Sequence, residues 1–163
     1  MKIALVRDVK SPVRGTKKSA GIDFFIPNDF AVSVINPGED ILIPSGVKAE
    51  IPEGYMLMAA EKSGVVTSKQ ACLKAGREPK ALAFTSVAVL GAKIVDEDYQ
   101  GEIHIHIVNV GNESVTLYPG TKIAQFILVP VKYEDIEVCE EDELFVEKSE
   151  RADKGFGKGT GEK

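Results

Sequence analysis

Four carboxylates fall within the seven residues 96–102, which read Asp-Glu-Asp-Tyr-Gln-Gly-Glu. Clustered carboxylates can bind Mg²⁺, or one of them can act as a general base. The same composition is typical of an acidic β-turn between two strands, and the segment alone favours that second interpretation. Catalysis and plain turn structure therefore both stay open at this point.

The segment 151–161 combines cations, glycines and one aromatic residue in the order Arg-Ala-Asp-Lys-Gly-Phe-Gly-Lys-Gly-Thr-Gly. Closely spaced glycines let backbone N–H groups approach a phosphate. Phe156 has nothing local to pack on and could stack on a base. Composition alone favours a flexible Gly-Lys tail. The segment is not a Walker loop, because the Gly-Lys-Ser/Thr order after a strand is absent.

Two further patterns have a chemical and a plain interpretation. Residues 61–64, Glu-Lys-Ser-Gly, follow the apolar run 56–60 and could grip a phosphate at a strand end, or could form a simple strand-to-loop turn. His104 and His106 alternate and so share one face of a strand. No third metal ligand is evident beside them, which favours a solvated or packed strand face.

The elements that must position these residues are predicted to be short strands. Hydrophobic alternation is clear in residues 40–43 and 102–108, and residues 1–6 also predict a short strand. Turn signals recur at residues 36–38, 52–54, 111–112 and 119–120. This spacing predicts an all-β sandwich, barrel or jelly roll. One short helix is predicted around residues 67–75, with Gly76 just past its end.

Composition narrows the class of protein. The 163 residues fit one domain, and 44% of them are apolar, which is enough for a core. The net charge of −5 disfavours duplex DNA or an anionic membrane as partner, but it permits a small phosphorylated ligand. No apolar run is long enough for a membrane span, no signal peptide is evident, and Cys72 and Cys139 are expected to be free thiols. We expect a cytoplasmic protein.

Taken together and in order, these segments resemble the five motifs of the trimeric dUTPase family. The matching segments are residues 19–24, 62–64, 96–102, 119–126 and 151–161. The third and fourth are the most specific, and the five span nearly the whole chain. Five weak patterns in a fixed order make coincidence improbable, so the resemblance outweighs the plain interpretations given above.

The resemblance implies an all-β, jelly-roll-like barrel with at most one short helix and a flexible C-terminal arm. It implies a β domain over residues 1–146, which holds an insertion loop at 69–86. A Gly-rich arm at residues 147–163 would close over an active site. It also implies a homotrimer with active sites at subunit junctions, an arrangement of ordinary closed symmetry.

The activity implied is that of a dUTP diphosphatase, which cuts dUTP into dUMP and pyrophosphate. Asp96 matches the family's general base and would activate a water for attack on the α-phosphorus. Mg²⁺ would sit on the triphosphate oxygens and neutralise charge. The protein need not ligate the metal directly, so no metal ligand is assigned.

By the same resemblance, Tyr99 would pack on the deoxyribose, the main chain at Gly91 and Ala92 would read uracil, and Phe156 would stack on the base. Phosphate contacts are implied for Lys62, Ser63, Gly64, Gln125, Arg151, Gly157, Lys158 and Thr160. Asp23 would support the site from behind or serve a structural role.

Three departures from the family pattern keep alternatives open. Lys62 stands where arginine is usual, Lys93 stands where a small residue is usual, and surplus residues lie within 69–86. A relative of the same fold could act on dCTP as a pyrophosphatase or a deaminase. A trimeric binding or regulatory protein could instead use the 69–86 loop as its partner contact. The Lys-Ser-Gly form is a hint of a viral or phage-type member, which would act in the host cytoplasm.

Overall fold

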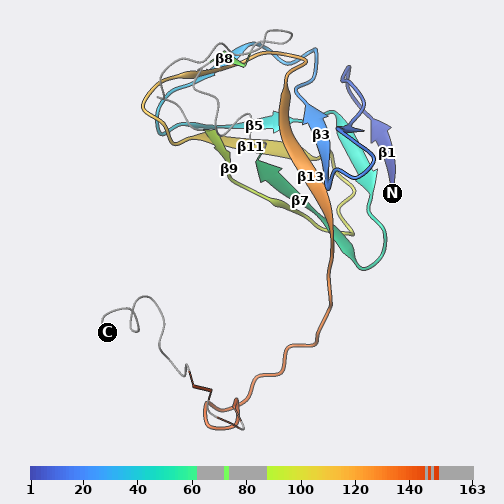
Figure 1. Ribbon diagram of the computed structural model, residues 1–163, viewed down its shortest axis with the longest axis vertical. Coiled ribbons are helices and arrows are strands. Elements are labelled where there is room, and N and C mark those ends of the chain that lie inside the picture. Colours follow the sequence, from blue (N-terminus) through green and yellow to red (C-terminus); the bar gives the residue numbers. More distant parts are fainter. Residues whose placement is uncertain (62–71, 74–87, 146, 148, 151–163) are drawn as a thin grey trace. The chain divides into compact units, whose positions relative to one another are not determined.

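The computed structural model describes residues 1–61, 72–73, 88–145, 147 and 149–150, and every regular element within them is a β-strand (Figure 1). The strands are β1 (Lys2–Leu5), β2 (Val13–Arg14), β3 (Gly21–Phe25), β4 (Ser33–Ile35), β5 (Asp40–Pro44), β6 (Val47–Glu50), β7 (Tyr55–Glu61), β8 (Cys72–Leu73), β9 (Ala88–Leu90), β10 (Ile94–Val95), β11 (His104–Asn109), β12 (Val115–Leu117) and β13 (Lys122–Pro130). No helix among these residues is long and apolar enough to cross a membrane.

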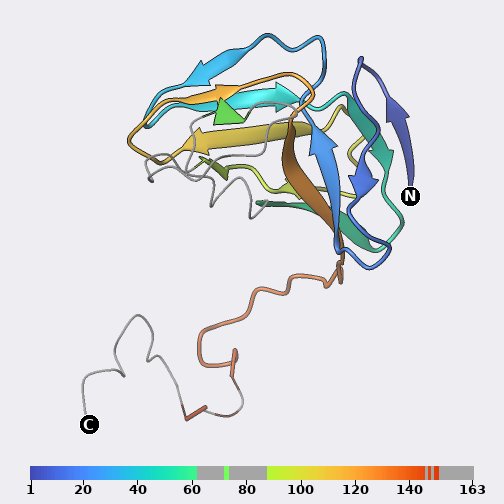
Figure 2. The same cartoon turned by 45° about the horizontal axis from the view of Figure 1, so that its top comes forward.

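The described strands form four sheets. The largest has the order β10-β7-β13-β3-β2, and its long central strand β13 pairs antiparallel with both β3 and β7. Two three-stranded sheets have the orders β5-β11-β9 and β4-β12-β8, and β1 pairs with β6. β5 and β11 lie side by side in Figure 1 and remain so when the molecule is tilted in Figure 2. The sheets do not close into a complete barrel.

A single apolar cluster between the sheets forms the core. The rings of Phe24 on β3 and Phe126 on β13 pack with centroids 4.4 Å apart. On β11 the burial alternates, so that Ile105 and Ile107 lie in the core while the intervening side chains face outward. This alternation is what a strand with one buried face requires.

Glycine turns connect the strands where the sequence predicts them. Gly38, Gly54 and Gly120 all have positive φ, between 75° and 82°. Residues with a Cβ rarely adopt this left-handed conformation, so these turns depend on glycine. The turn at Gly54 is further held by its N–H, which donates to the carboxylate of Glu97 at 2.7 Å.

The all-β, jelly-roll-like fold predicted from sequence is confirmed, and so are the strands at residues 1–6, 40–43 and 102–108. The predicted helix at 67–75 is wrong at Cys72 and Leu73, which form β8 and pair parallel with β12. Hydrogen bonding to a neighbouring strand overrides a local helix pattern there. The rest of that segment lies outside the described residues.

The chain divides into two compact units, Met1–Lys132 and Tyr133–Lys163. All described strands belong to the first unit, and the last of them ends at Pro130. The described part of the second unit has no regular element, and Ile136 and Val138 are each 93% exposed. A domain boundary at residue 146 stays a prediction.

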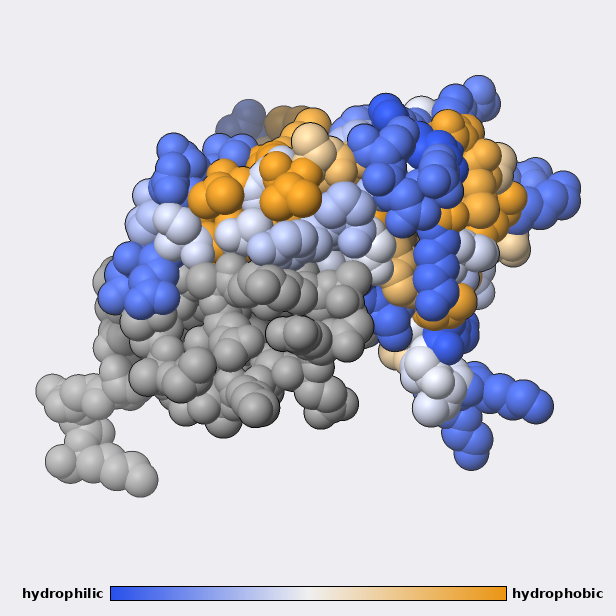
Figure 3. Space-filling view, turned by 90° about the horizontal axis from the view of Figure 1, so that it is seen from above, coloured by the Kyte–Doolittle hydropathy of each residue, from blue (hydrophilic) through white to orange (hydrophobic). Residues whose placement is uncertain are grey.

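Apolar side chains also reach the surface of the first unit. Figure 3 shows apolar groups on the face seen from above, in patches that hydrophilic groups separate. The exposed apolar residues include Val32, Val34 on β4, Leu42 on β5 and Ile94 on β10, each more than half exposed.

The packing of Phe126 generates a stability prediction. Phe126 is 1% exposed and contacts Phe24, so Phe126→Ala should lower the free energy of unfolding by about 3–5 kcal/mol. Chemical denaturation would measure this change. The exposed Glu53→Ala is the control and should stay within about 0.5 kcal/mol of the parent. A Phe126→Ala variant as stable as the control would contradict the assigned core.

Candidate active site

A hollow of about 200 Å³ brings together residues from four parts of the first unit. It lies among β5, the segment 88–95, the turn that follows β10, and β11. The segment 88–95 is named the β9–β10 hairpin for its chain reversal, although β9 pairs with β11 and β10 pairs with β7. Its lining residues are Leu42, Ala92, Ile94, Val95, Asp96, Tyr99, Ile103 and His104. A carboxylate, an aromatic ring and the hairpin backbone therefore share one small, partly apolar space, which is the usual character of a ligand site.

Asp96 enters this hollow from the turn that follows β10. The N–H of Tyr99 donates to the Asp96 carbonyl at 3.2 Å, which closes a four-residue turn. Within the turn, the Glu97 carboxylate accepts the Gly54 N–H and is thereby directed to the β6–β7 connection. Asp96 itself is exposed. The carboxylates of Asp96 and Glu97 therefore lie in different environments, and only that of Asp96 lines the hollow.

The ring of Tyr99 is held in place from two sides. Its hydroxyl donates to the Glu102 carbonyl at 2.9 Å. A Cβ at Gly101 would collide with the Tyr99 ring, so the ring lies directly against the Gly101 backbone. This contact explains why position 101 requires glycine. Tyr99 remains 42% exposed, so a ligand can reach its ring.

Glu102 connects the turn to the N-terminal part of the chain. Its Oε1 atom accepts hydrogen bonds from Nε of Arg7 at 2.8 Å and from the Gly46 N–H at 2.7 Å. Burial of the Glu102 carboxylate would by itself raise its pKa, but the hydrogen bonds from Arg7 and Gly46 outweigh burial and hold the pKa below its usual range. The carboxylate is therefore a fixed structural anion.

The β9–β10 hairpin is tied to β7 through Glu61. The Lys93 ammonium lies 2.6 Å from the Glu61 carboxylate, and the Leu90 N–H donates to the same oxygen at 3.4 Å. The hydrogen bond from Lys93 holds the pKa of Glu61 below its usual range despite partial burial. Lys93 therefore has a specific partner and is not a cation that simply extends into solvent.

On its other side the hairpin contacts β11. The Gly91 N–H donates to the carbonyl of His106 at 2.9 Å, and the Ala92 N–H donates to the Nδ1 atom of the same residue at 3.1 Å. Nε2 of His106 lies 2.9 Å from the Asp40 carboxylate. The imidazole thus bridges the hairpin backbone and β5.

Gln125 and Asp23 lie opposite each other on β13 and β3. The Gln125 side-chain amide donates to the Glu61 carbonyl at 3.0 Å, and a Cβ at Gly21 would collide with that side chain. Asp23 is 5% exposed and lies 2.9 Å from the Lys122 ammonium. A buried carboxylate with a cationic partner suits the supporting role that the sequence predicts for Asp23.

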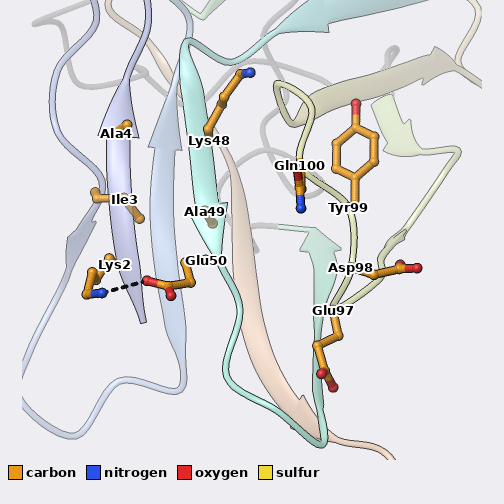
Figure 4. A pocket seen from close by; sticks show the side chains of 10 residues that line it. All are labelled: Lys2, Ile3, Ala4, Lys48, Ala49, Glu50, Glu97, Asp98, Tyr99 and Gln100. Atoms are coloured by element: carbon orange, nitrogen blue, oxygen red, sulfur yellow. Dashed lines mark ion pairs between the residues drawn. The ribbon is translucent and has the colours of Figure 1, made fainter.

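A larger hollow of about 420 Å³ is lined in part by the same turn (Figure 4). Strands β1 and β6 form one wall, and residues 97–100 form the other. Lys2 and Glu50 make an exposed ion pair at 3.0 Å across the two strands. Tyr99 lines both hollows, but Asp96 lines only the smaller one, so the smaller hollow is where a general base is available.

The described residues contain no cluster of three His, Cys, Asp or Glu side chains that could hold a metal ion. Carboxylates of the acidic run 96–102 instead have separate partners: Glu97 accepts from the Gly54 N–H and Glu102 from the Gly46 N–H. We assign no protein ligand to a metal in this part of the chain.

Comparison with known proteins identifies the family. The family model described as dUTPase matches residues 54–160, which is well over half of the chain. The chain belongs to the dUTPase family. The deoxyuridine 5'-triphosphate nucleotidohydrolase of Hydrogenobaculum sp. (strain Y04AAS1) is 34% identical over 154 residues, which cover 94% of this chain and 92% of that protein.

Solved dUTPases have the same fold. The Staphylococcus bacteriophage 80alpha dUTPase with dUPNHPP has a TM-score of 0.73 and 25% identity, and the match covers 96% of each chain. A mutant dUTPase from phage phi11 of S. aureus has a TM-score of 0.67 and 23% identity over 88% of this chain and 98% of that one. The phi11 structure reveals the coordination of a structural Mg(II) ion in that protein.

The structure places some of the residues that the dUTPase motifs predict. Asp96, Tyr99 and Ala92 line one hollow, with Gly91 next to Ala92 on the hairpin. Gln125 joins them indirectly, since its partner Glu61 also holds the hairpin. The predicted site residues outside the described part of the chain are Lys62, Ser63, Gly64, Arg151, Phe156, Gly157, Lys158 and Thr160. Of the loop 69–86, only Cys72 and Leu73 are described.

Sequence reasoning did not anticipate Glu61 and His106 as contacts of the hairpin. The sequence held no signal that singles out Glu61, because a lysine as exposed as Lys93 needs no anionic partner. No local signal identified His106, because alternation on a strand predicts only which face a side chain occupies.

The lowered pKa of Glu102 leads to a pH prediction. A group whose pKa is lower in the folded than in the unfolded chain adds stability above the unfolded pKa, about 4.3 for glutamate, and this contribution is lost as the pH falls through the lowered value. Glu102→Gln should therefore be less stable than the parent at pH 7 and should lose less stability on acidification to about pH 3.

Urea denaturation of parent and variant at several pH values would measure both effects. The variant should keep part of the acid dependence, because Glu61 also has a lowered pKa. An unchanged acid dependence in Glu102→Gln would show that Glu102 is not a source of it.

Proposed function

We propose that this member of the dUTPase family hydrolyses dUTP to dUMP and pyrophosphate. The observation that carries the proposal is that Asp96, Tyr99 and Ala92 line one hollow of about 200 Å³. The family resemblance assigns these residues to the water, the sugar and the base respectively. Residues with three complementary tasks in one space form a coherent site.

In this mechanism Asp96 takes a proton from a water molecule. The water oxygen forms a bond to the α-phosphorus, and the bond from that phosphorus to the oxygen bridging to the β-phosphorus breaks. The electron pair leaves with pyrophosphate, and dUMP remains. The contribution of Asp96 is that of a positioned general base, for which an exposed carboxylate at the wall of the hollow is suitable.

Mg²⁺ is the proposed cofactor, and when bound it would neutralise charge on the triphosphate. We assign the ion to phosphate oxygens and water, with no ligand from the described residues. This leaves the Asp96 carboxylate available for the attacking water.

Tyr99 is proposed to recognise deoxyribose by shape. Its ring is fixed by the hydroxyl bond to the Glu102 carbonyl and by contact with the Gly101 backbone. A ring that cannot withdraw leaves no space for a ribose 2′-hydroxyl, so a ribonucleotide would meet a steric clash there.

Phosphate contacts are proposed for Gln125 in the described part of the chain and for Lys62, Ser63 and Gly64 directly after β7. The arm 147–163, through Arg151, Phe156, Gly157, Lys158 and Thr160, is proposed to close over the substrate. A closing arm of this kind excludes water from the reacting groups.

We also propose a homotrimer that acts in the cytoplasm, with active sites at the subunit junctions and the β domain and arm as predicted. The exposed apolar side chains on β4, β5 and β10 support assembly, because such surface is buried favourably between subunits. The exposed Ile136 and Val138 of the second unit are further apolar groups that assembly could cover.

The ion pair of Lys93 with Glu61 gives Lys93 a contact within the protein. A dCTP-specific relative could use Lys93 toward its pyrimidine, but that ligand would compete with the Glu61 carboxylate, which lies 2.6 Å from the Lys93 ammonium. This competition favours dUTP modestly, because both side chains are partly exposed.

The test of the proposed function is pyrophosphate release from dUTP, dCTP, dTTP and UTP, each with Mg²⁺ and with a chelator. We expect dUTP to exceed each of the others in kcat/KM by about 10²-fold or more, and the chelator to abolish turnover. Preference for dCTP would overturn the substrate assignment. No turnover of any of the four would favour the binding-protein alternative.

Asp96→Asn tests the base. The variant keeps the size of the side chain but cannot accept the proton, so kcat should fall by about 10³-fold or more while the affinity for dUTP stays within a few fold. Asp135→Asn, an exposed carboxylate in the second unit, is the control and should turn over normally. Normal kcat in Asp96→Asn would eliminate Asp96 as the base.

A further inference from the structure

We propose that His106, braced by Asp40, is a positioning residue that determines base specificity by fixing the polarity of the β9–β10 hairpin. The inference deepens the proposed function and rests on it, because it takes the Gly91–Ala92 backbone as the part that reads the base. Neither His106 nor Asp40 belongs to the motifs that identify the family.

The brace consists of a diagonal pair across two strands. His106 stands opposite Leu42 in the β5–β11 register, and Asp40 lies two residues further along β5 on the same outward face. Diagonal neighbours of this kind are within reach of long side chains. Nε2 of His106 lies 2.9 Å from Oδ2 of Asp40, and the His106 side chain is 28% exposed.

The contacts determine the tautomer of His106. The Ala92 N–H donates to Nδ1, so Nδ1 must carry a lone pair. The proton of the neutral ring then resides on Nε2, where it donates to the Asp40 carboxylate. Asp40 thereby holds the ring in the tautomer that can accept from the hairpin.

Gly91 lets the imidazole come this close. A Cβ at Gly91 would collide with the His106 ring, so the ring lies directly against the hairpin backbone. The Gly91 N–H donates to the His106 carbonyl, and the Ala92 N–H donates to its ring. One residue of β11 therefore takes both donors of the Gly91–Ala92 segment.

The consequence is a backbone segment that offers acceptors. With both N–H groups engaged, the groups that Gly91 and Ala92 can still offer to a ligand are their carbonyl oxygens, each with two lone pairs. Uracil presents an N–H at ring position 3, whereas cytosine presents a lone pair there. Where one of these carbonyls faces ring position 3, uracil donates to it and cytosine cannot, while the position-4 oxygen of uracil takes its donor from outside Gly91 and Ala92.

The same geometry predicts what the loss of the ring does. Without His106 the Ala92 N–H becomes an unengaged donor that can meet the position-3 acceptor of cytosine, and the hairpin loses its brace to β5. His106→Ala should raise KM for dUTP by about 5–10-fold, keep kcat within about twofold, and lower the dUTP-to-dCTP ratio of kcat/KM by about tenfold.

Steady-state kinetics on dUTP and dCTP would compare the full-length parent with four variants. Asp40→Ala should change KM and discrimination in the same direction as His106→Ala but less, since the ring remains. His106→Gln should restore most of both, because the glutamine amide offers one acceptor and one donor. Glu53→Gln, an exposed carboxylate outside the hollow, is the control and should match the parent.

A readout of the hairpin itself keeps the role separable from folding. Amide hydrogen exchange at Ala92 should speed up in His106→Ala and return toward the parent rate in His106→Gln, while core amides of β13 keep their protection. The Asp40 side chain is 63% exposed, so Asp40→Ala tests its contact with His106 without disturbing the core.

Each outcome has a definite meaning. Parental KM, discrimination and Ala92 exchange in His106→Ala would overturn the role of His106 while dUTP turnover stands. A His106→Gln variant no better than His106→Ala would show that packing, and not hydrogen-bond polarity, matters there, which also overturns the proposal. Absence of dUTP turnover in the parent would instead overturn the proposed function on which the inference rests.

Discussion

The burial of one face of β11 is the constraint on which the candidate site depends. Ile103, Ile105 and Ile107 are each 1% exposed, and a slip of one residue would exchange them for the residues between them. Because the apolar face cannot move, the outward side chains and the turn that precedes β11 have fixed positions. Ile103 belongs to the core and also lines the hollow, so the core helps to set the shape of the hollow.

Close backbone contacts carry this constraint into the site. Gly91, Gly101 and Gly21 each lack a Cβ where a side chain lies against the backbone, namely the imidazole of β11, the Tyr99 ring and the Gln125 amide. Such contacts have little tolerance, because a single added methyl group would displace the neighbour. Glycine at these three positions serves close approach, whereas Gly38, Gly54 and Gly120 adopt positive φ.

The ion pairs around the site are partly exposed, and pairs of this kind add little to stability. Their effect is on geometry. Glu61 joins the end of β7, the hairpin and β13 through its Lys93, Leu90 and Gln125 contacts, and Glu102 joins the turn after β10 to Arg7 and Gly46. A site built from four separate segments needs such links, because no single element holds all of its groups.

Much of the fold followed from periodicity. Alternation in residues 40–43 and 102–108 predicted β5 and β11, and the glycine turns at 38, 54 and 120 lie where the sequence signals them. The helix prediction was wrong at Cys72 and Leu73, because pairing with β12 across more than 40 residues decides their conformation. Local propensity has no access to a partner so distant in sequence.

For the site, the order of the motifs determined the family and named Asp96, Tyr99 and the Gly91–Ala92 backbone, since these depend on residue type and spacing along the chain. Only the tertiary structure decided which carboxylate of the acidic run lines the hollow, which anion pairs with Lys93, and which face of the hairpin His106 occupies. The physical reason is the sequence separation of these contacts, 32 residues for Glu61 with Lys93 and 66 for Asp40 with His106. Such partners are selected by the packing of whole sheets, which no local pattern encodes.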